Sequence, residues 1–104
     1  MKYYYNKLVR DKIVQNINNK GCKSEFKILN EEEYKSQLDK KLLEEVNEVI
    51  EAHSAEEIGD LLEVVQAIMR EYNISENEVK TQMEQKRKDK GAFEDKIYFI
   101  SVEE

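Results

Sequence analysis

Proline is absent from the 104-residue sequence, and glycine occurs only three times. Charged residues make up 38% of the chain and hydrophobic residues 39%. This balance favours solvated amphipathic helices over a disordered chain or a sandwich of short strands. The length predicts a single domain, residues 1–104, of a size at which burial is incomplete and a partner subunit often helps. We therefore expect an oligomer.

Cysteine and histidine each occur once, as Cys22 and His53. A single cysteine excludes an internal disulfide, and a thiolate metal site is disfavoured because no second thiol is nearby. A ferritin-like di-iron site requires Glu-x-x-His on two helices, but Ile50 stands three residues before the histidine. We expect Cys22 to be a small loop or edge residue and His53 to interact with the dipole at a helix C-terminus.

Long apolar runs are also missing, since no stretch approaches the roughly 20 residues that span a bilayer. The start MKYYYNKLVRDK is too polar for a signal peptide, so we expect a cytoplasmic protein without a membrane partner. Asp and Glu outnumber Lys and Arg by 23 to 17, and the net charge of -6 argues against a nucleic-acid polymer as partner. A free nucleotide held by a metal ion and a few local lysines is compatible with this charge.

Capping and periodicity signals predict four helices. The first covers residues 8–20, where apolar side chains recur four positions apart ahead of Gly21. The others cover residues 30–53, 54–72 and 75–90, and each opens with Asn or Ser followed three residues later by Glu. The second and third helices meet at a tight turn, so they are expected to form a helical hairpin.

Two segments rich in β-branched and aromatic residues are predicted as strands. Residues 24–29 read as a short strand, and residues 96–102 as a C-terminal strand that can pair with it. The expected fold class is therefore mainly α: a helical-hairpin bundle of about four helices with a short C-terminal β-strand.

One acidic pattern occurs twice in the predicted hairpin, as EEVNEVIEA and, three residues later, EEIGDLLEV. At about 100° per residue, Glu45 falls inside the apolar stripe of the predicted helix 30–53, and Glu48 lies at the edge of that stripe. Glu57 and Asp60 take the same two positions on the next helix. Because the two helices pack antiparallel, we expect the four carboxylates to converge.

Four carboxylates at a partly dry seam are unfavourable unless something positive balances them, because uncompensated buried charges are costly. A divalent cation with a preference for oxygen provides this balance. An all-carboxylate ligand set indicates Mg²⁺, with Mn²⁺ as the alternative ion. A second interpretation stays open, in which these acids pair with lysines across a subunit interface.

Basic residues on the predicted fourth helix and near the first helix are expected to bind the phosphates of a nucleotide. The apolar stripe of the fourth helix continues through Lys86 and Lys90, so its inward face turns basic. Lys7 and Arg10, at the first helix, offer further cations. Inward acids with a hard cation, together with inward lysines, describe a polyphosphate site. No Gly-rich phosphate loop is present, which disfavours a P-loop enzyme.

The residues Glu44-Glu45-x-x-Glu48 and Glu57-x-x-Asp60, on adjacent helices, resemble the signature of the all-α nucleoside triphosphate pyrophosphohydrolases. This superfamily includes the MazG proteins, the dimeric dUTPases and phosphoribosyl-ATP pyrophosphohydrolase. The opening YNKLVRDKI and the closing KGAFEDKIYF are similar to the small phosphoribosyl-ATP pyrophosphohydrolase-like branch. The resemblance covers nearly the whole chain, with Lys90-Gly91 where Arg-Gly is expected.

The resemblance implies hydrolysis between the α and β phosphates of a nucleotide, giving a nucleoside monophosphate and pyrophosphate, with Mg²⁺ as cofactor. It implies that the metal ligands are the four converging acids, Glu45, Glu48, Glu57 and Asp60, and that the chain forms a homodimer or larger homo-oligomer. Housecleaning of unwanted nucleotides and turnover of phosphoribosyl-ATP both fit this chemistry. Glu44 is expected to orient the attacking water or accept its proton.

The alternative from another class is a non-catalytic helical module. Such a module would dimerise or regulate, and would bind nucleotide or protein without turnover. Release of pyrophosphate from a nucleotide panel with Mg²⁺ discriminates the two hypotheses.

Overall fold

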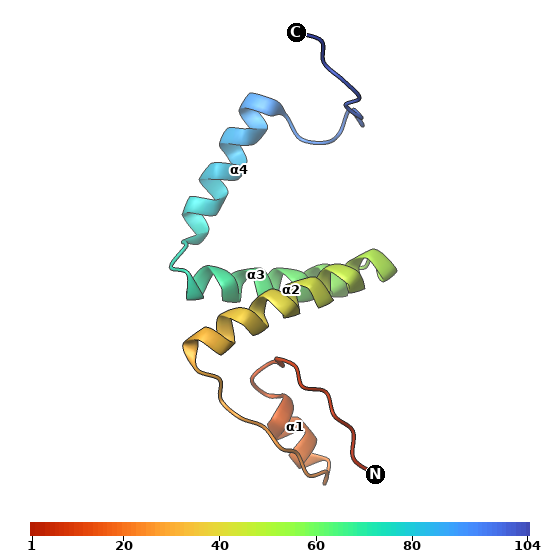
Figure 1. The fold of residues 1–104 in the computed structure, drawn as a ribbon, viewed down its shortest axis with the longest axis vertical. Coiled ribbons are helices and arrows are strands. Elements are labelled where there is room, and N and C mark those ends of the chain that lie inside the picture. The colour runs from red at the N-terminus through yellow and green to blue at the C-terminus, as the bar shows by residue number, and fades with distance from the viewer. The chain divides into compact units, whose positions relative to one another are not determined.

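The computed structural model describes all 104 residues and contains four α-helices and no strand. The helices are α1 (Ile13–Asn19), α2 (Glu31–Ala52), α3 (Ala55–Glu71) and α4 (Glu76–Lys90), labelled in Figure 1. The prediction of a mainly α fold with four helices is confirmed. Two compact units are present, residues 1–72 and residues 73–104. That the whole chain acts as one domain stays a prediction.

The start of α2 is defined by a capping box at Asn30 and Glu33. The Glu33 backbone N–H donates to Asn30 Oδ1 at 2.8 Å, and the Asn30 backbone N–H donates to Glu33 Oε1 at 3.2 Å. These bonds satisfy two backbone donors that a helix start otherwise leaves unpaired. The bond from the Asn30 backbone also lowers the pKa of Glu33. The predicted helix start at Asn30 is confirmed.

The connection between α2 and α3 consists of His53 and Ser54. His53 ends α2 in the left-handed conformation (φ 48°, ψ 43°), and its N–H donates to the Val49 carbonyl at 2.8 Å. Ser54 Oγ then accepts the Glu57 backbone N–H at 3.2 Å and starts α3. As predicted, the histidine stands at a helix C-terminus and the two helices form a hairpin.

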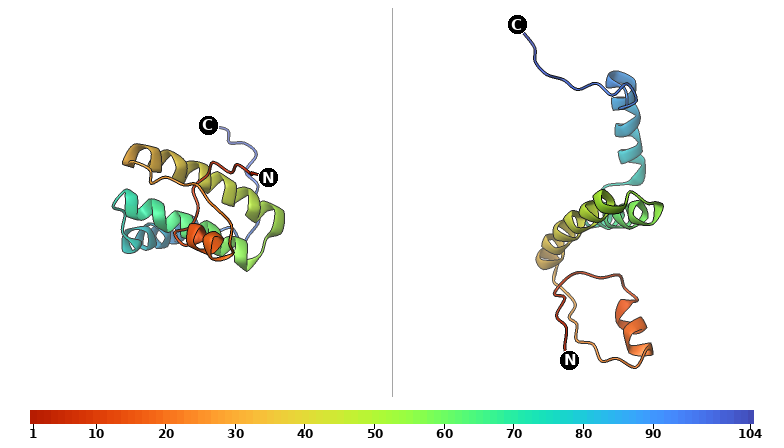
Figure 2. Two further views of the ribbon diagram at one scale, coloured as in Figure 1. Left: turned by 90° about the horizontal axis from the view of Figure 1, so that it is seen from below. Right: turned by 90° about the vertical axis from the view of Figure 1, so that its right-hand side faces the viewer.

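The hairpin contains the only closely packed pair of helices in the structure. Figure 2 shows α2 and α3 running side by side along their lengths. Leu38 is 1% exposed, and it and Val64 are the buried hydrophobic side chains. Glu45, from the middle of α2, is the one buried charged residue. A carboxylate therefore lies within the seam that these apolar side chains create.

The first helix is shorter than predicted. Helix α1 begins at Ile13, so the prediction that it starts at residue 8 is wrong. The residues before Ile13 lie outside the helix, and two of them, Lys7 and Arg10, form ion pairs with α2 and α3. The end of α1 follows the prediction: Gly21 has φ +83°, and its N–H donates to the Asn18 carbonyl at 3.0 Å.

The two predicted strands are not formed. Residues 24–29 and 96–102 lie outside helices and strands. A β-strand requires a ladder of hydrogen bonds to a neighbour, and β propensity alone does not provide one. No such ladder is present at either segment. Cys22, just before the first of them, is exposed in a loop, as predicted.

The unit formed by residues 73–104 contains α4 and the segment that follows it. Ser75 Oγ accepts the Glu78 backbone N–H at 3.0 Å and starts the helix. Gly91, with φ +83°, ends it by donating its N–H to the Arg87 carbonyl at 2.9 Å. None of the four helices combines the length and the apolar character needed to cross a membrane.

The near-complete burial of Leu38 leads to a stability prediction. Leu38→Ala should lower the free energy of unfolding by about 2–5 kcal/mol, because it removes buried methyl groups and leaves a cavity in the seam. Urea denaturation followed by circular dichroism measures the change. Asp39→Ala, at the exposed neighbouring position, is the control and should change the stability little. Equal effects of the two substitutions would contradict this packing.

Candidate metal centre

Three of the four predicted ligands converge at the seam of the hairpin. Glu45, Glu57 and Asp60 each offer a carboxylate oxygen, and these three oxygens lie within 4.8 Å of one another. Glu45 is 8% exposed, and the other two residues are half-buried. Glu57 and Asp60 stand three residues apart near the start of α3, so they project from the same side of that helix. The expected convergence of acids from two helices is thus observed for three residues.

Glu48 does not belong to this group of three. It is exposed, and its oxygens lie outside the set of mutually close ligand atoms. Its charge still acts on the group, since Glu48 is the carboxylate that contributes most to raising the pKa of Glu57 after burial. The position of Glu48 at the edge of the stripe explains both observations, because a side chain at that angle lies beside the seam.

Lys41 is a member of the site that the sequence analysis missed. Its Nζ lies 3.4 Å from Glu44 Oε1 and 3.4 Å from Glu45 Oε1, and its side chain is largely buried. The signal was present in the sequence, because Lys41 precedes these two acids by three and four residues on one helix. This lysine supplies positive charge to the acids of α2 from within the same helix.

The N-terminal segment supplies two further cations. Lys7 Nζ donates a hydrogen bond to Glu44 Oε1 at 2.9 Å, and Arg10 Nη2 donates one to Asp60 Oδ1 at 2.7 Å. Arg10 Nη1 also lies 3.9 Å from Glu63 Oε1. The acids therefore pair with basic residues of their own chain. Pairing of the four predicted ligands with lysines across a subunit interface stays a prediction.

Of the three converging acids, only Glu57 forms no ion pair. Burial raises its pKa, and the charges of Glu48, Asp60, Glu56 and Glu45 raise it further. Both effects disfavour the ionised carboxylate. Negative charge at the centre of the group is thus only partly balanced by the cations of the chain.

Glu44, the predicted proton acceptor, is occupied by two lysines. The hydrogen bond from Lys7 lowers the pKa of Glu44, and Lys41 adds to this effect. The same hydrogen bond raises the pKa of Lys7. A carboxylate with a lowered pKa is a weak base, so Glu44 must be released from Lys7 before it can accept a proton.

The donor atoms fit a hard divalent cation. Every ligand atom of the group is a carboxylate oxygen, which Mg²⁺ and Mn²⁺ prefer, and no nitrogen or sulfur ligand is near enough to join them. Bonds of about 2.0–2.1 Å to Mg²⁺ place opposite ligands about 4 Å apart. Neighbouring ligands of one ion are only about 3 Å apart, so the three oxygens would draw closer together to hold it.

The predicted substrate lysines of α4 lie in the other unit. Lys86 and Lys90 are both exposed, and along α4 only Val79 is half-buried. The inward basic face predicted for this helix is therefore not found within residues 73–104. Lys90 lines an open hollow with residues 91–97. Contact of these lysines with a substrate stays a prediction.

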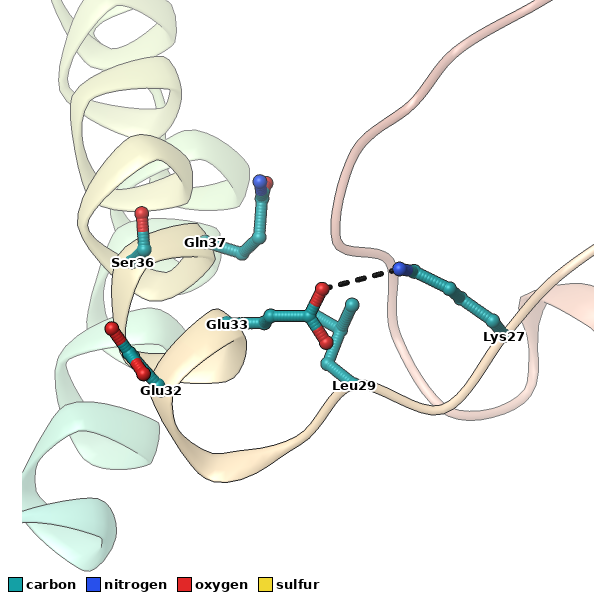
Figure 3. Close-up of a pocket in the computed structure, with 6 residues that line it drawn as sticks. All are labelled: Lys27, Leu29, Glu32, Glu33, Ser36 and Gln37. Atoms are coloured by element: carbon teal, nitrogen blue, oxygen red, sulfur yellow. Dashed lines mark hydrogen bonds and ion pairs between the residues drawn. The ribbon is translucent and has the colours of Figure 1, made fainter.

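A second open hollow lies at the start of α2. Figure 3 shows the side chains that line it: Lys27, Leu29, Glu32, Glu33, Ser36 and Gln37. Lys27 Nζ and Glu33 Oε2 form an ion pair of 3.2 Å across it. None of the predicted site residues lines this hollow, so the acidic group at the seam is the better candidate site.

Comparisons with protein-family models, with curated proteins and with solved structures found no match to the chain. The resemblance to the all-α pyrophosphohydrolases therefore rests on the motifs of the sequence. The geometry of the acidic group is an observation independent of that resemblance.

The raised pKa of Glu57 leads to a prediction about pH. The fold binds a proton at Glu57 more tightly than the unfolded chain does, so it is favoured at low pH and loses this contribution as pH rises from about 4.5 through the raised pKa. Glu57→Gln should remove this dependence and raise the melting temperature at neutral pH without metal. The variant keeps the cap with Ser54, which uses the backbone N–H.

Melting temperatures of the two proteins between pH 4 and pH 8, without and with Mg²⁺, measure this effect. Mg²⁺ should raise the melting temperature of the natural protein and have little effect on the variant. Identical pH profiles for the two proteins would show that Glu57 carries no unfavourable charge.

Proposed function

We propose that the chain is a Mg²⁺-dependent nucleotide pyrophosphohydrolase of the all-α, MazG-like kind, similar to phosphoribosyl-ATP pyrophosphohydrolase. The observation that carries this proposal is the convergence of Glu45, Glu57 and Asp60 at one seam, with Glu57 lacking a cationic partner. The sequence motifs add the reaction class: cleavage between the α and β phosphates to give a nucleoside monophosphate and pyrophosphate. Mn²⁺ is the alternative ion.

The residues of the chain divide into three roles in this proposal. Glu45, Glu57 and Asp60 would hold the cation, and Glu48, at the edge of the seam, is the proposed fourth ligand. A bound divalent cation would supply charge that polarises the phosphates and activates the attacking water. Glu44 is the proposed proton acceptor, once Lys7 has left it.

Positive charge for the phosphates comes from basic residues of the chain. Lys7 and Arg10 stand next to the acidic group in the structure. Lys86 and Lys90 of α4 are proposed as further phosphate ligands on the basis of the sequence pattern. Cations at these positions stabilise the charge that develops on the leaving pyrophosphate.

Asp60 provides the sharpest test of this function. Asp60→Asn should lower pyrophosphate release from a nucleotide panel by at least about 100-fold, since even outer-shell partners of a bound metal contribute about 10- to 100-fold. Glu51→Gln, an exposed acid of α2 without an ion pair, is the control and should retain turnover. Full activity of Asp60→Asn would remove this residue from the site. Nucleotide binding without product in the natural protein would favour the non-catalytic module.

We also infer that two copies of the chain associate through an apolar face of the hairpin. Leu43 and Ile50 of α2 are 65% and 61% exposed, and Ile58 and Leu62 of α3 are exposed as well. At about 100° per residue, Leu43 and Ile50 lie roughly 120–140° around α2 from the buried Leu38, and Ile58 and Leu62 lie roughly 120–160° around α3 from the buried Val64. In an antiparallel pair these rotations turn both sets to the same side of the hairpin.

A second copy is the occupant that best fits this face. The hairpin buries only Leu38 and Val64 among its hydrophobic side chains, which is a small core for a stable fold. Two hairpins related by a twofold axis would bury the same face on both copies and form a four-helix arrangement. The acidic side chains point to the other side, so association leaves the candidate metal centre accessible.

Polar substitutions on this face test the association. Leu43→Ser combined with Ile50→Ser should shift the molar mass measured by light scattering from dimer to monomer, because the shared apolar area is lost. Lys40→Ser combined with Glu51→Ser, two exposed residues of the same helix, is the control and should leave the mass unchanged. A natural protein that is monomeric at high concentration would contradict the proposal.

A further inference from the structure

We propose that Lys7 and Arg10 act as an exchangeable strap over the candidate metal centre. They balance its acids when no metal is bound, and they move to the phosphates of the nucleotide when a divalent cation takes their place. This inference rests on the proposed function and adds to it an order of binding, with the cation before the nucleotide. The strap is defined as residues 1–12, which precede α1.

The strap reaches both helices of the hairpin across its seam. Lys7 contacts α2 at Glu44, and Arg10 contacts α3 at Asp60, with donor–acceptor distances of 2.9 and 2.7 Å. Residues 1–12 contain no helix or strand. The two cations thus bind one acid on each helix: Glu44, the neighbour of Glu45, and Asp60, one of the three converging ligands.

These ion pairs can exchange because they are exposed. The Arg10 side chain is 57% exposed and that of Asp60 is 37% exposed. Ion pairs that water can reach contribute little net stability. A divalent cation beside Asp60 also repels the guanidinium, because like charges a few ångströms apart are unfavourable. Metal binding at the acidic group therefore displaces Arg10.

Lys41 provides the contrast within the same site. It lies on α2 together with its partners Glu44 and Glu45, and its side chain is only 17% exposed. The helix fixes it three and four residues from these acids, so it stays in place when a cation binds. Only the strap can leave without disturbing the hairpin.

After displacement, Lys7 and Arg10 stay tethered next to the acidic group, and the proposal assigns them to the nucleotide's phosphates. A guanidinium offers paired donors that match phosphate oxygens, and its charge is retained at any physiological pH. Release of Lys7 also removes the shorter of the two lysine contacts of Glu44, the proposed proton acceptor, and leaves the 3.4 Å contact with Lys41. One movement of the strap therefore uncovers Asp60, loosens the hold on Glu44 and presents cations to the substrate.

Metal affinity gives the first test. Mn²⁺ binding to the full chain is measured by electron paramagnetic resonance for the natural protein and for Arg10→Gln. Loss of the competing guanidinium should tighten Mn²⁺ binding about two- to fivefold, the range expected from losing one exposed ion pair. Lys12→Gln removes the same charge two residues away, from a lysine without an ion pair, and should change affinity less. Equal changes in the two variants would overturn the exchange.

Pyrophosphate affinity gives the second test. With Mn²⁺ bound, Arg10→Gln should bind inorganic pyrophosphate about tenfold more weakly than the natural protein, because a charged hydrogen bond is lost. Lys12→Gln should bind it normally. If Arg10→Gln binds Mn²⁺ more tightly but keeps full affinity for pyrophosphate, the proposed transfer of Arg10 to phosphate is wrong.

Accessibility of the strap gives a third readout that does not depend on turnover. Tryptic cleavage after Lys7 and Arg10, followed by mass spectrometry, should accelerate with Mn²⁺ alone and slow again when pyrophosphate is added. Cleavage after Lys88, on α4, serves as the internal reference. Mn²⁺ binding without any change in cleavage would overturn the strap and leave the proposed function standing. A natural protein that binds no Mn²⁺ would overturn both.

Discussion

Crowding of like charge at the α2–α3 seam is the constraint on which the rest of the structure depends. The short connection through His53 and Ser54 forces the two helices together, and the pattern of their sequences turns Glu45 toward Glu57 and Asp60. Negative charge in a partly buried place is unfavourable unless cations balance it. Lys41 balances part of this negative charge. The functional inferences about the site follow from the negative charge that no cation of the hairpin balances.

The balancing cations differ in how firmly they are held. Lys41 shares a helix with its partners, so its contacts come with the helix itself. Lys7 and Arg10 come from a segment without regular structure, and their ion pairs are solvent-exposed. In the proposed mechanism, Lys41 is therefore the permanent counter-charge, and Lys7 and Arg10 are the exchangeable ones. The proposed divalent cation would then bind without unfolding the hairpin.

The two sides of the hairpin have opposite chemistry. By helical periodicity, the exposed apolar side chains Leu43, Ile50, Ile58 and Leu62 fall on the side opposite Glu44 and Asp60. Segregation of this kind would allow the proposed metal centre and the proposed association surface to share two helices. These four apolar side chains face away from the seam, which is one reason why the hairpin buries so few hydrophobic residues.

Helix boundaries followed from local signals in the sequence. The caps at Asn30, Ser54 and Ser75 appear where Asn or Ser precedes Glu by three residues, because these contacts involve only near neighbours. The burial of Glu45 followed from helical periodicity for the same reason. Capping and periodicity are properties of a few adjacent residues, so sequence alone determined four helices, the hairpin and the inward direction of one acid.

Contacts between distant residues were decided only by the tertiary structure. Arg10 meets Asp60 across 50 positions of the chain, and no local pattern encodes that contact. The same applies to the predicted strand over residues 96–102, because a strand exists only when a distant neighbour supplies its hydrogen bonds. Glu48 lies at the edge of the apolar stripe of α2, so helical periodicity alone did not decide whether it faces the seam. The packing of the two helices leaves it exposed and outside the acidic group. Sequence determined which residues can face inward, and packing determined which of them meet.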